Sequence, residues 1–332
     1  MGFNSRFAAF AVAMAAALWS GAVPTSALSP NTGPMLLEPT QQMADALRCH
    51  ETDKPAGHEP VLLVHGLTST GAETFDWSWV PALLAEGYDV CTVDLPDRAM
   101  ADIQREAEYV VHAIRAMADR FESKVDVMAV SLGPLAARWV VRWWPDVRAA
   151  VDDLVSLVGV NRGSDLSKIL CADGRCVPAA WQLARDSEFV GALNSEDESP
   201  GEIHYMSIYT RSDHLAFPQF PTSVSEIEGA VNVPIDSLCP TRFPEHVQMV
   251  FDAVVYAVIT DALTDDGRFD PARFDRAACA KDFMPGVTAT EAAGREYVMY
   301  ENAARQLGMA WRKVDAEPPL RCYARPDGCP TG

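Results

Sequence analysis

A serine at a sharp turn is the residue of this sequence best suited to nucleophilic chemistry. Ser131 lies in the segment Ala129-Val130-Ser131-Leu132-Gly133, after the valine-rich stretch 124–128 and before an apolar stretch of helical spacing from Pro134. A strand–turn–helix of this kind exposes the serine hydroxyl above a sheet. The next backbone amide, that of Leu132, then lies at a helix N-terminus and is available to a developing oxyanion. Only Ala129 departs from the G-x-S-x-G pattern.

A serine nucleophile needs a histidine base, and three histidines follow Ser131 in the chain: His204, His214 and His246. His204 falls inside a strand pattern, and His214 directly follows Asp213. His246 lies in a late loop that runs into a helix, where α/β-hydrolases carry the triad histidine. We therefore expect His246 to be the base.

The triad acid is expected between the serine and the histidine, just past a strand. Asp213 follows the strand pattern that ends at Tyr209, and it is the preferred candidate. Asp236 is the alternative. Before the serine, His65 precedes Gly66 in a turn-forming loop, and we expect it to have a structural role.

Strands and helices alternate along the chain, which predicts an α/β fold with a mostly parallel central sheet and helices on both faces. The expected strands are Pro60–Val64, Tyr88–Val93, Leu154–Val160 and His204–Tyr209, besides the one before Ser131. The expected helices are Trp79–Glu86, Asp102–Phe121, Val247–Leu263 and one opened by the capping box Thr288–Glu291 that runs to about Leu307. Residues 161–200 lack clear sheet periodicity and are expected to form a small cap over the site.

The N-terminus has the features of a secretory signal peptide. Arg6 precedes the apolar segment Phe7–Trp19, and Thr25-Ser26-Ala27 offers small residues for cleavage. We expect residues 1–27 to be removed and residues 28–332 to form one catalytic domain of a secreted protein. No other segment is long and apolar enough to span a bilayer.

Eight cysteines, an even number, agree with export. Locality favours the pairs Cys171–Cys176 and Cys322–Cys329, and the remaining four pair most simply as Cys49–Cys91 and Cys239–Cys279. A zinc site is the alternative, but no CxxC pair or histidine-rich spacing supports it. We expect no metal.

Composition narrows the class of partner. The chain has 332 residues, a hydrophobic fraction of 48% and a formal net charge of −19. These values fit one large globular domain, and the absence of a basic patch argues against nucleic acid. We expect a monomer.

Several segments resemble the family of Candida antarctica lipase B. Members of that family are secreted serine lipases with the α/β-hydrolase fold. The similar segments include Val61-Leu62-Leu63-Val64-His65-Gly66, Tyr209-Thr210-Arg211-Ser212-Asp213, Glu245-His246 and Tyr323-Ala324-Arg325-Pro326. The resemblance implies the triad Ser131, Asp213 and His246. It also implies the disulfides Cys49–Cys91 and Cys239–Cys279 and a third bridge close to Cys322–Cys329, while Cys171–Cys176 has no counterpart in that family.

Two departures from that family concern substrate binding. Leu67 stands in place of a threonine, so the expected oxyanion donors are the backbone amides of Leu67 and Leu132. Val130 stands in place of a tryptophan, which predicts more space on the alcohol side unless Trp181 of the cap fills it. Val130 and Trp181 are therefore the expected substrate-binding residues.

The sequence predicts a secreted serine carboxylic-ester hydrolase, a triacylglycerol lipase without cofactor, that acts on lipids or other hydrophobic esters. One alternative is a polyester depolymerase of the polyhydroxyalkanoate type, since A-x-S-x-G boxes also occur there. Another is a catalytically silent secreted binding protein on the same scaffold.

Overall fold

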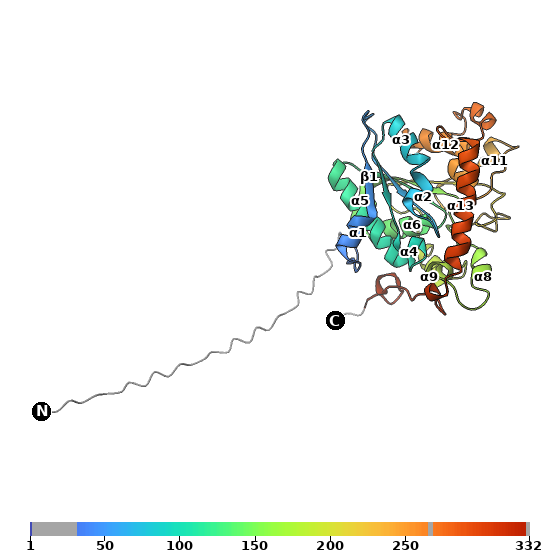
Figure 1. The fold of residues 1–332 in the computed structure, drawn as a ribbon. Coiled ribbons are helices and arrows are strands. Elements are labelled where there is room, and N and C mark those ends of the chain that lie inside the picture. The colour runs from blue at the N-terminus through green and yellow to red at the C-terminus, as the bar shows by residue number, and fades with distance from the viewer. Residues whose placement is uncertain (2–31, 265–267, 330–332) are drawn as a thin grey trace.

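A seven-stranded sheet in the order β1-β3-β2-β4-β5-β6-β7 forms the centre of the computed structural model (Figure 1). The structure describes Met1 and residues 32–264 and 268–329, so the expected signal peptide lies outside the described residues except for Met1. The strands are β1 (Leu47–His50), β2 (Val61–Val64), β3 (Val90–Val93), β4 (Val125–Val130), β5 (Val151–Leu157), β6 (His204–Tyr209) and β7 (Val231–Pro234). Among the described strands of this sheet, the β1–β3 pairing is antiparallel and the other pairings are parallel.

The register of the central strands brings two loops to one edge of the sheet. Val64, the last residue of β2, pairs with Ala129 near the end of β4. Because these strands are parallel, the loop after β2 and the turn after β4 leave the sheet side by side. All residues of both strands are buried, as the continuous apolar run of β2 predicts, and β4 also buries Asp126.

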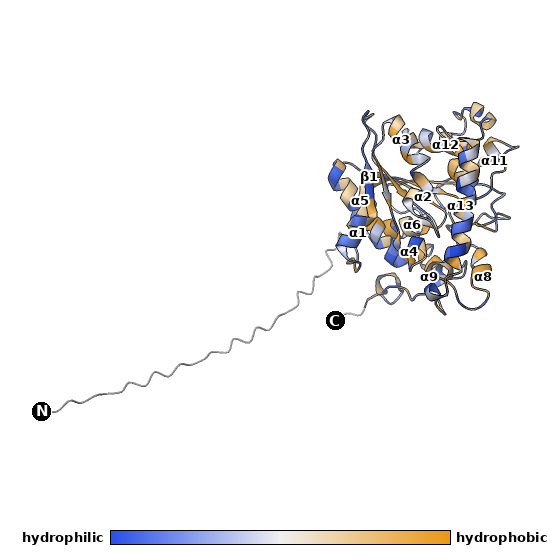
Figure 2. Ribbon diagram, viewed as in Figure 1, coloured by the Kyte–Doolittle hydropathy of each residue, from blue (hydrophilic) through white to orange (hydrophobic). Residues whose placement is uncertain are grey.

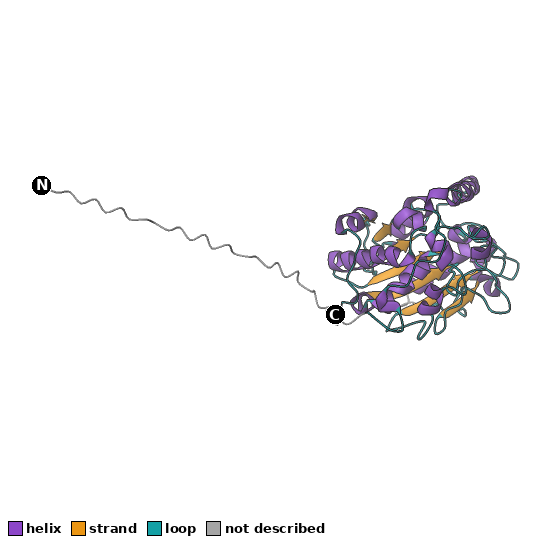
Figure 3. Ribbon diagram, turned by 90° about the horizontal axis from the view of Figure 1, so that it is seen from below, coloured by secondary structure: helices purple, strands orange, loops and turns teal. Residues whose placement is uncertain are grey.

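Helices cover both faces of the sheet (Figure 3). The α-helices are α1 (Thr40–Ala46), α2 (Gly71–Phe75), α3 (Trp79–Glu86), α4 (Pro96–Ala99), α5 (Ile103–Phe121), α6 (Gly133–Trp143), α7 (Pro145–Ala150), α8 (Leu166–Leu170), α9 (Pro178–Gln182), α10 (Glu188–Leu193), α11 (Ile235–Leu238), α12 (Ala253–Thr264) and α13 (Ala289–Leu307). Short 3₁₀ helices are η1 (Gln248–Phe251), η2 (Arg276–Ala280), η3 (Ala310–Arg312) and η4 (Cys322–Ala324).

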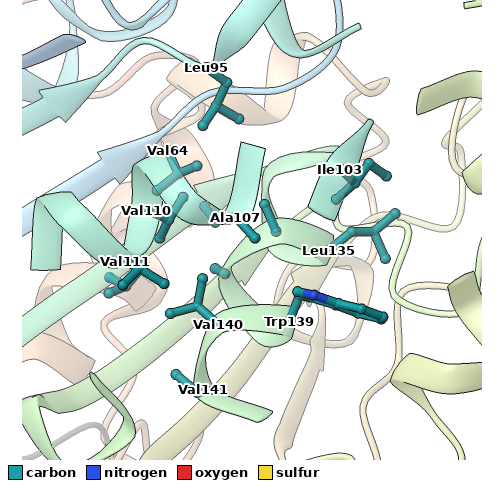
Figure 4. Packing of buried hydrophobic residues seen from close by; sticks show 14 of the residues in the cluster. Val64, Leu95, Ile103, Ala107, Val110, Val111, Leu135, Trp139, Val140 and Val141 are labelled. Atoms are coloured by element: carbon teal, nitrogen blue, oxygen red, sulfur yellow. The ribbon is translucent and has the colours of Figure 1, made fainter. Parts of the chain in front are cut away.

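Each face of the sheet has its own hydrophobic core. Helices α5 and α6 pack on one face, where Val110 and Trp139 lie in the same cluster as Val64 of the sheet (Figure 4). Helices α3 and α12 pack on the other face. The sheet and α12 are mostly hydrophobic, whereas α13 carries long hydrophilic stretches (Figure 2). The two cores fix the sheet from both sides, so the loops at its edge start from rigid positions.

Helix ends follow the sequence signals closely. Helix α3 ends at Gly87, whose φ of 95° is left-handed, and α5 begins after Asp102, whose carboxylate accepts from Gln104 N–H. The expected capping box of α13 is present, with Thr288 Oγ1 accepting from Glu291 N–H.

Two expected elements differ most from the structure. Strand β5 spans Val151–Leu157 rather than Leu154–Val160, and it ends early because Val158 has a φ of 44°, which a strand does not allow. The expected helix 247–263 is divided into η1 and α12. Asp252 is extended between them, and its carboxylate caps the start of α12 by accepting from the N–H groups of Val254 and Val255.

Four disulfides join Cys49 to Cys91, Cys171 to Cys176, Cys239 to Cys279 and Cys322 to Cys329, the pairs expected from the sequence. The first links directly paired residues of β1 and β3. None of the helices in the described part of the chain combines the length and hydropathy needed to cross a membrane.

Candidate active site

Ser131 occupies the turn between β4 and α6 in a left-handed conformation, with a φ of 61°. The neighbouring segment holds both backbone groups of this residue. Its N–H donates to the carbonyl of Leu157 at 2.9 Å, and its carbonyl accepts from Val160 N–H at 3.1 Å. A non-glycine residue persists in this backbone region only where its surroundings fix it, so the strain is consistent with a functional position.

Two glycines allow the loop after β2 to lie directly against this turn. A β-carbon on Gly66 would come within 2.7 Å of the β-carbon of Ser131. A β-carbon on Gly133 would lie 2.8 Å from the carbonyl oxygens of Val64 and His65. Both distances are too short for any side chain, so only glycine permits this approach.

Ser131, His246 and Asp213 form a continuous chain of hydrogen bonds. The Oγ of Ser131 lies 2.8 Å from Nε2 of His246, and Nδ1 of His246 lies 2.7 Å from Oδ2 of Asp213. The other carboxylate oxygen of Asp213 accepts from the N–H groups of Leu215 and Ala216 at 2.9 and 2.7 Å. With Nδ1 donating to the carboxylate, Nε2 is free to accept the serine proton. The structure thus brings together the three residues that the sequence singled out.

The charge environment favours the protonated form of His246. Burial by itself lowers the pKa of this imidazole, but the charge of Asp213, its hydrogen bond and the charge of Glu245 outweigh burial and raise the pKa. A base whose conjugate acid is stabilised by a buried carboxylate accepts a proton more readily.

Leu67 and Leu132 both line the pocket beside Ser131. Neither backbone N–H is hydrogen-bonded to another residue that the structure describes. The next amide, that of Thr68, is not available in this way because it donates to the carbonyl of Arg98 at 2.7 Å. Unbonded N–H groups beside a nucleophile are suitable donors to an oxyanion.

A pocket of about 230 Å³ opens onto Ser131 and His246. Apolar side chains from several elements form most of its wall, namely Leu67, Val130, Leu132, Val160, Leu166, Leu170, Leu183, Leu215, Val247, Val250, Met299, Ala303 and Leu307. Glu73, Tyr300 and Asn302 are among the polar lining residues. The pocket is therefore suited to an apolar group joined to a polar reacting centre.

The walls of the pocket correct one expectation from the sequence. Val130 lines the pocket as expected, but Trp181 does not. Trp181 lies on α9. Its indole donates to the carbonyl of Val314 at 3.2 Å, and its ring packs against a small cluster that includes Met100 and Cys176. Within the segment 161–200, the pocket is lined by Leu166, Leu170 and Leu183.

Sequence reasoning missed the contribution of α13 to the pocket. This helix supplies Met299, Tyr300, Asn302, Ala303 and Leu307, although it follows the triad histidine by more than 40 residues. Met299, Ala303 and Leu307 are spaced four residues apart and so lie on one helix face. That spacing was the available signal, but it indicates an apolar face and not the surface that the face covers.

The remaining candidates have structural partners. His65 is fully buried. Its Nδ1 donates to the Gly66 carbonyl at 2.9 Å, its Nε2 accepts from Leu95 N–H at 2.9 Å, and burial lowers its pKa. Asp236 forms an ion pair with Arg211. His214 lies beside Tyr300, whose hydroxyl is 3.2 Å from its Nε2.

His204 lies at the opposite edge of the sheet, where Asp152, Asp153 and His204 place possible metal-ligand atoms within 4.8 Å of one another. Lys124 Nζ already lies 2.6 Å from Asp152 in this cluster. His204 Nδ1 bonds to Asp153 at 3.0 Å, which agrees with a structural role.

Known proteins resemble this chain in both sequence and fold. The model of the class 2 lipase family matches residues 58–255, more than half of the chain. Lipase B of Pseudozyma (Candida) antarctica is 28% identical over 309 residues, 90% of this chain and 89% of that protein.

Among solved structures, Aspergillus fumigatus lipase B has a TM-score of 0.81 at 23% identity and covers 90% of this chain and 74% of its own. The mature lipase BlEst2 of Bacillus licheniformis has a TM-score of 0.53 at 16% identity, with 65% of this chain and 97% of its own covered. These two likenesses concern the fold. Together with the family match, they show that the chain is an α/β-hydrolase and belongs to the class 2 lipases, which makes it a carboxylic ester hydrolase.

Proposed function

We propose that this chain is a secreted lipase that hydrolyses hydrophobic carboxylic esters through an acyl-enzyme on Ser131. One observation carries the proposal: the hydrogen-bond chain from Ser131 through His246 to Asp213 lies at the wall of an apolar pocket. Triacylglycerols are the substrate class that fits this pocket and the family best.

In the first half of the reaction, Ser131 Oγ bonds to the ester carbonyl carbon while its proton passes to Nε2 of His246. Asp213 stabilises the imidazolium and keeps the ring oriented. The carbonyl oxygen becomes an oxyanion and accepts from the free N–H groups of Leu67 and Leu132. When the tetrahedral species collapses, the carbon–oxygen bond to the alcohol breaks, and His246 returns the proton to the departing alcohol.

In the second half, water replaces the alcohol. His246 takes a proton from the water as its oxygen bonds to the acyl carbon, and the same N–H groups hold the second oxyanion. The bond to Ser131 Oγ then breaks, the serine regains its proton from His246, and the carboxylic acid leaves.

The four disulfides support the proposal that the chain is secreted. Disulfides form and persist in oxidising compartments, which agrees with removal of residues 1–27 and export of residues 28–332 as one catalytic domain. The segment 161–200 would serve as a cap, since three of its leucines line the pocket. We expect this domain to act as a monomer.

Labelling with a fluorophosphonate tests the mechanism. The probe should phosphonylate the wild-type protein at Ser131, identified by peptide mass spectrometry, and should leave folded Ser131→Ala unlabelled. Labelling at another serine, or Ser131→Ala retaining more than a few per cent of the esterase activity, would contradict the assignment. Rates on emulsified triacylglycerol, short p-nitrophenyl esters and polyhydroxyalkanoate films then separate a lipase from an esterase and from a polyester depolymerase.

A further inference from the structure

Arg98 contacts the loop that carries the expected oxyanion donor Leu67. The backbone N–H of Thr68 donates to the carbonyl of Arg98 at 2.7 Å, and Nε of Arg98 donates to the carbonyl of Thr68 at 2.9 Å. One residue thus binds both backbone groups of Thr68, the residue that directly follows Leu67.

The peptide groups around Leu67 are held from the other side as well. The Thr68 hydroxyl donates to the carbonyl of Leu67 at 2.6 Å, and the carbonyl of Gly66 accepts from His65 Nδ1 at 2.9 Å. Among the backbone groups of residues 66–68, the three carbonyls and the amide of Thr68 have partners, whereas the amides of Gly66 and Leu67 have none in the described part of the chain. That pattern suits a donor that must point at a reacting atom without reorganising.

The backbone is strained where α4 meets the 66–68 loop, because most residues of this short element are left-handed. Thr68 has a φ of 68°, and Asp97, Arg98 and Ala99 have φ values of 50°, 64° and 56°. Left-handed backbone is unfavourable for residues with a β-carbon and persists only where other contacts enforce it. Here it turns the carbonyl and the side chain of Arg98 toward the same neighbour.

Glu73 fixes the other end of the Arg98 side chain. Nη2 of Arg98 forms an ion pair with the Glu73 carboxylate, which lines the pocket. Glu73 lies in the first turn of α2, where its N–H donates to Oγ1 of the N-cap residue Thr70 at 3.2 Å. Its Oε1 accepts from Asn302 of α13 at 3.4 Å. A planar guanidinium can bond through Nε to Thr68 and through Nη2 to Glu73 at once, whereas a lysine ammonium is a single point charge.

We propose that Arg98 is a positioning residue that, oriented by Glu73, holds the 66–68 loop so that the amide of Leu67 is aimed at the oxyanion. The inference rests on the proposed function, because it assigns a role in the same acyl transfer. The contact acts on the transition state, so its loss lowers kcat and the affinity for a tetrahedral analogue more than it changes KM.

The test compares Arg98→Gln, Arg98→Lys and Glu73→Gln with wild type on a soluble p-nitrophenyl butyrate assay. A phenylboronic acid, which forms a tetrahedral adduct with the serine, reports on the oxyanion hole directly. Loss of one oxyanion donor costs about 10²–10³ in kcat, so a misaimed donor in Arg98→Gln should lower kcat about 10- to 100-fold. The inhibition constant of the boronic acid should rise in proportion, with KM within about threefold of wild type.

The conservative variants should have kcat values and boronic acid inhibition constants between those of wild type and Arg98→Gln. Arg98→Lys keeps a cation beside Glu73 but loses the paired geometry, and Glu73→Gln keeps a hydrogen-bond acceptor but loses the charge. The matched control is Arg105→Gln, which removes another arginine–glutamate pair, Arg105 with Glu38 at 2.7 and 3.0 Å. It should lower the melting temperature without changing kcat or the boronic acid inhibition constant.

The inference is overturned if folded Arg98→Gln keeps wild-type kcat and boronic acid affinity, or if Arg105→Gln loses as much kcat. Should Arg98→Gln not fold, Arg98→Lys and Glu73→Gln decide the matter, and wild-type constants in both reject it. These results are distinct from failure of the proposed function, which would appear as hydrolysis by the wild type that does not depend on Ser131 and would remove the inference with it.

Discussion

Two aspartate–histidine pairs lie at opposite ends of the parallel strands, and one of them lies beside a serine. At the edge where the parallel strands end, His246 Nδ1 lies 2.7 Å from Asp213. At the edge where they begin, His204 Nδ1 lies 3.0 Å from Asp153. By bond length alone the two pairs are similar.

Their surroundings differ in every respect that matters for catalysis. The side chains of His246 and Asp213 are 6% and 0% exposed, whereas that of His204 is 31% exposed. The pair at His246 has Ser131 at 2.8 Å and unbonded amides nearby. The pair at His204 has Asp152 and Lys124 as neighbours. Burial, chiefly, raises the pKa of Asp153 to about 6. A histidine bound to a carboxylate thus becomes a candidate base through what its second nitrogen meets.

Loss of the base should separate the two pairs most strongly. Nucleophile and base act as a unit, so His246→Ala should lower kcat on the order of 10⁶-fold. His204→Ala should leave kcat within about twofold of wild type, since it lies at the far edge. Ester hydrolysis by purified, folded variants is the measurement, and comparable losses in both variants would remove the distinction.

The acid of the pair should matter next. Asp213→Asn should lower kcat about 10⁴-fold, because the amide no longer fixes the productive histidine tautomer. Asp153→Asn and Asp236→Asn are the controls at the other pair and at the alternative acid. We expect near wild-type kcat from both, and a larger loss in Asp236→Asn than in Asp213→Asn would reverse the assignment.

Substitution of Asp126 should change the stability of the fold and not catalysis. It is almost fully buried on β4, and burial, then the charge of Asp153, raises its pKa well above the usual value. In unfolded chains an aspartate ionises near pH 4, so from there upward the folded state binds more protons and loses stability as pH rises. Asp126→Asn removes this penalty.

We therefore expect Asp126→Asn to increase the free energy of unfolding at pH 7 by about 1 kcal/mol, the usual size of a stabilising substitution. The gain should shrink toward pH 4, and kcat should not change. Urea unfolding at several pH values measures it. An equal loss of stability at every pH would show that the carboxylate itself is needed there.

The smallest effect concerns the charge of Glu245, which helps to raise the pKa of His246. The base works in its neutral form, so Glu245→Gln should lower that pKa and increase kcat/KM on the acidic limb. The increase should be about threefold at most, the value of a partly exposed charge pair, with no change on the alkaline plateau.

Glu226→Gln is the matched control for this variant. Glu245 accepts from the hydroxyl of Tyr300, and Glu226 accepts from that of Tyr209 at 2.9 Å. Glu226 does not contribute to the pKa of His246. Its pH profile should follow wild type. A shift of the acidic limb in both variants would point to a general effect of net charge.

Much of the sheet and the residues of the triad could be predicted because their signals are local. Strand β2 is a continuous apolar run, β4 is rich in valine, and the turn at Ser131 has its own sequence pattern. Strands β1 and β7 escaped prediction because most of their residues are half-exposed or exposed, so no hydrophobic pattern marks them. Edge strands depend on their neighbour more than on their own sequence.

The walls of the pocket were less predictable than its chemistry. Trp181 belongs to the cap segment but does not line the pocket, and α13 lines the pocket from a segment late in the chain. Tertiary docking of a helix depends on the shape of a surface that the helix sequence does not contain. The roles of Thr68 and Arg98 were hidden for the same reason, because their contact joins a loop to α4 across 30 residues of sequence.

Helix α13 also gives this scaffold unusual freedom to diversify. It lines the pocket with five residues, yet Ala292 is the one side chain of the helix that is fully buried. Substitutions at Ala303 and Leu307, which line the pocket and lie outside both cores, therefore alter the space offered to a substrate while the two cores and the triad stay intact. Lineages under selection for new esters, and directed-evolution libraries alike, can explore this helix at little risk to folding.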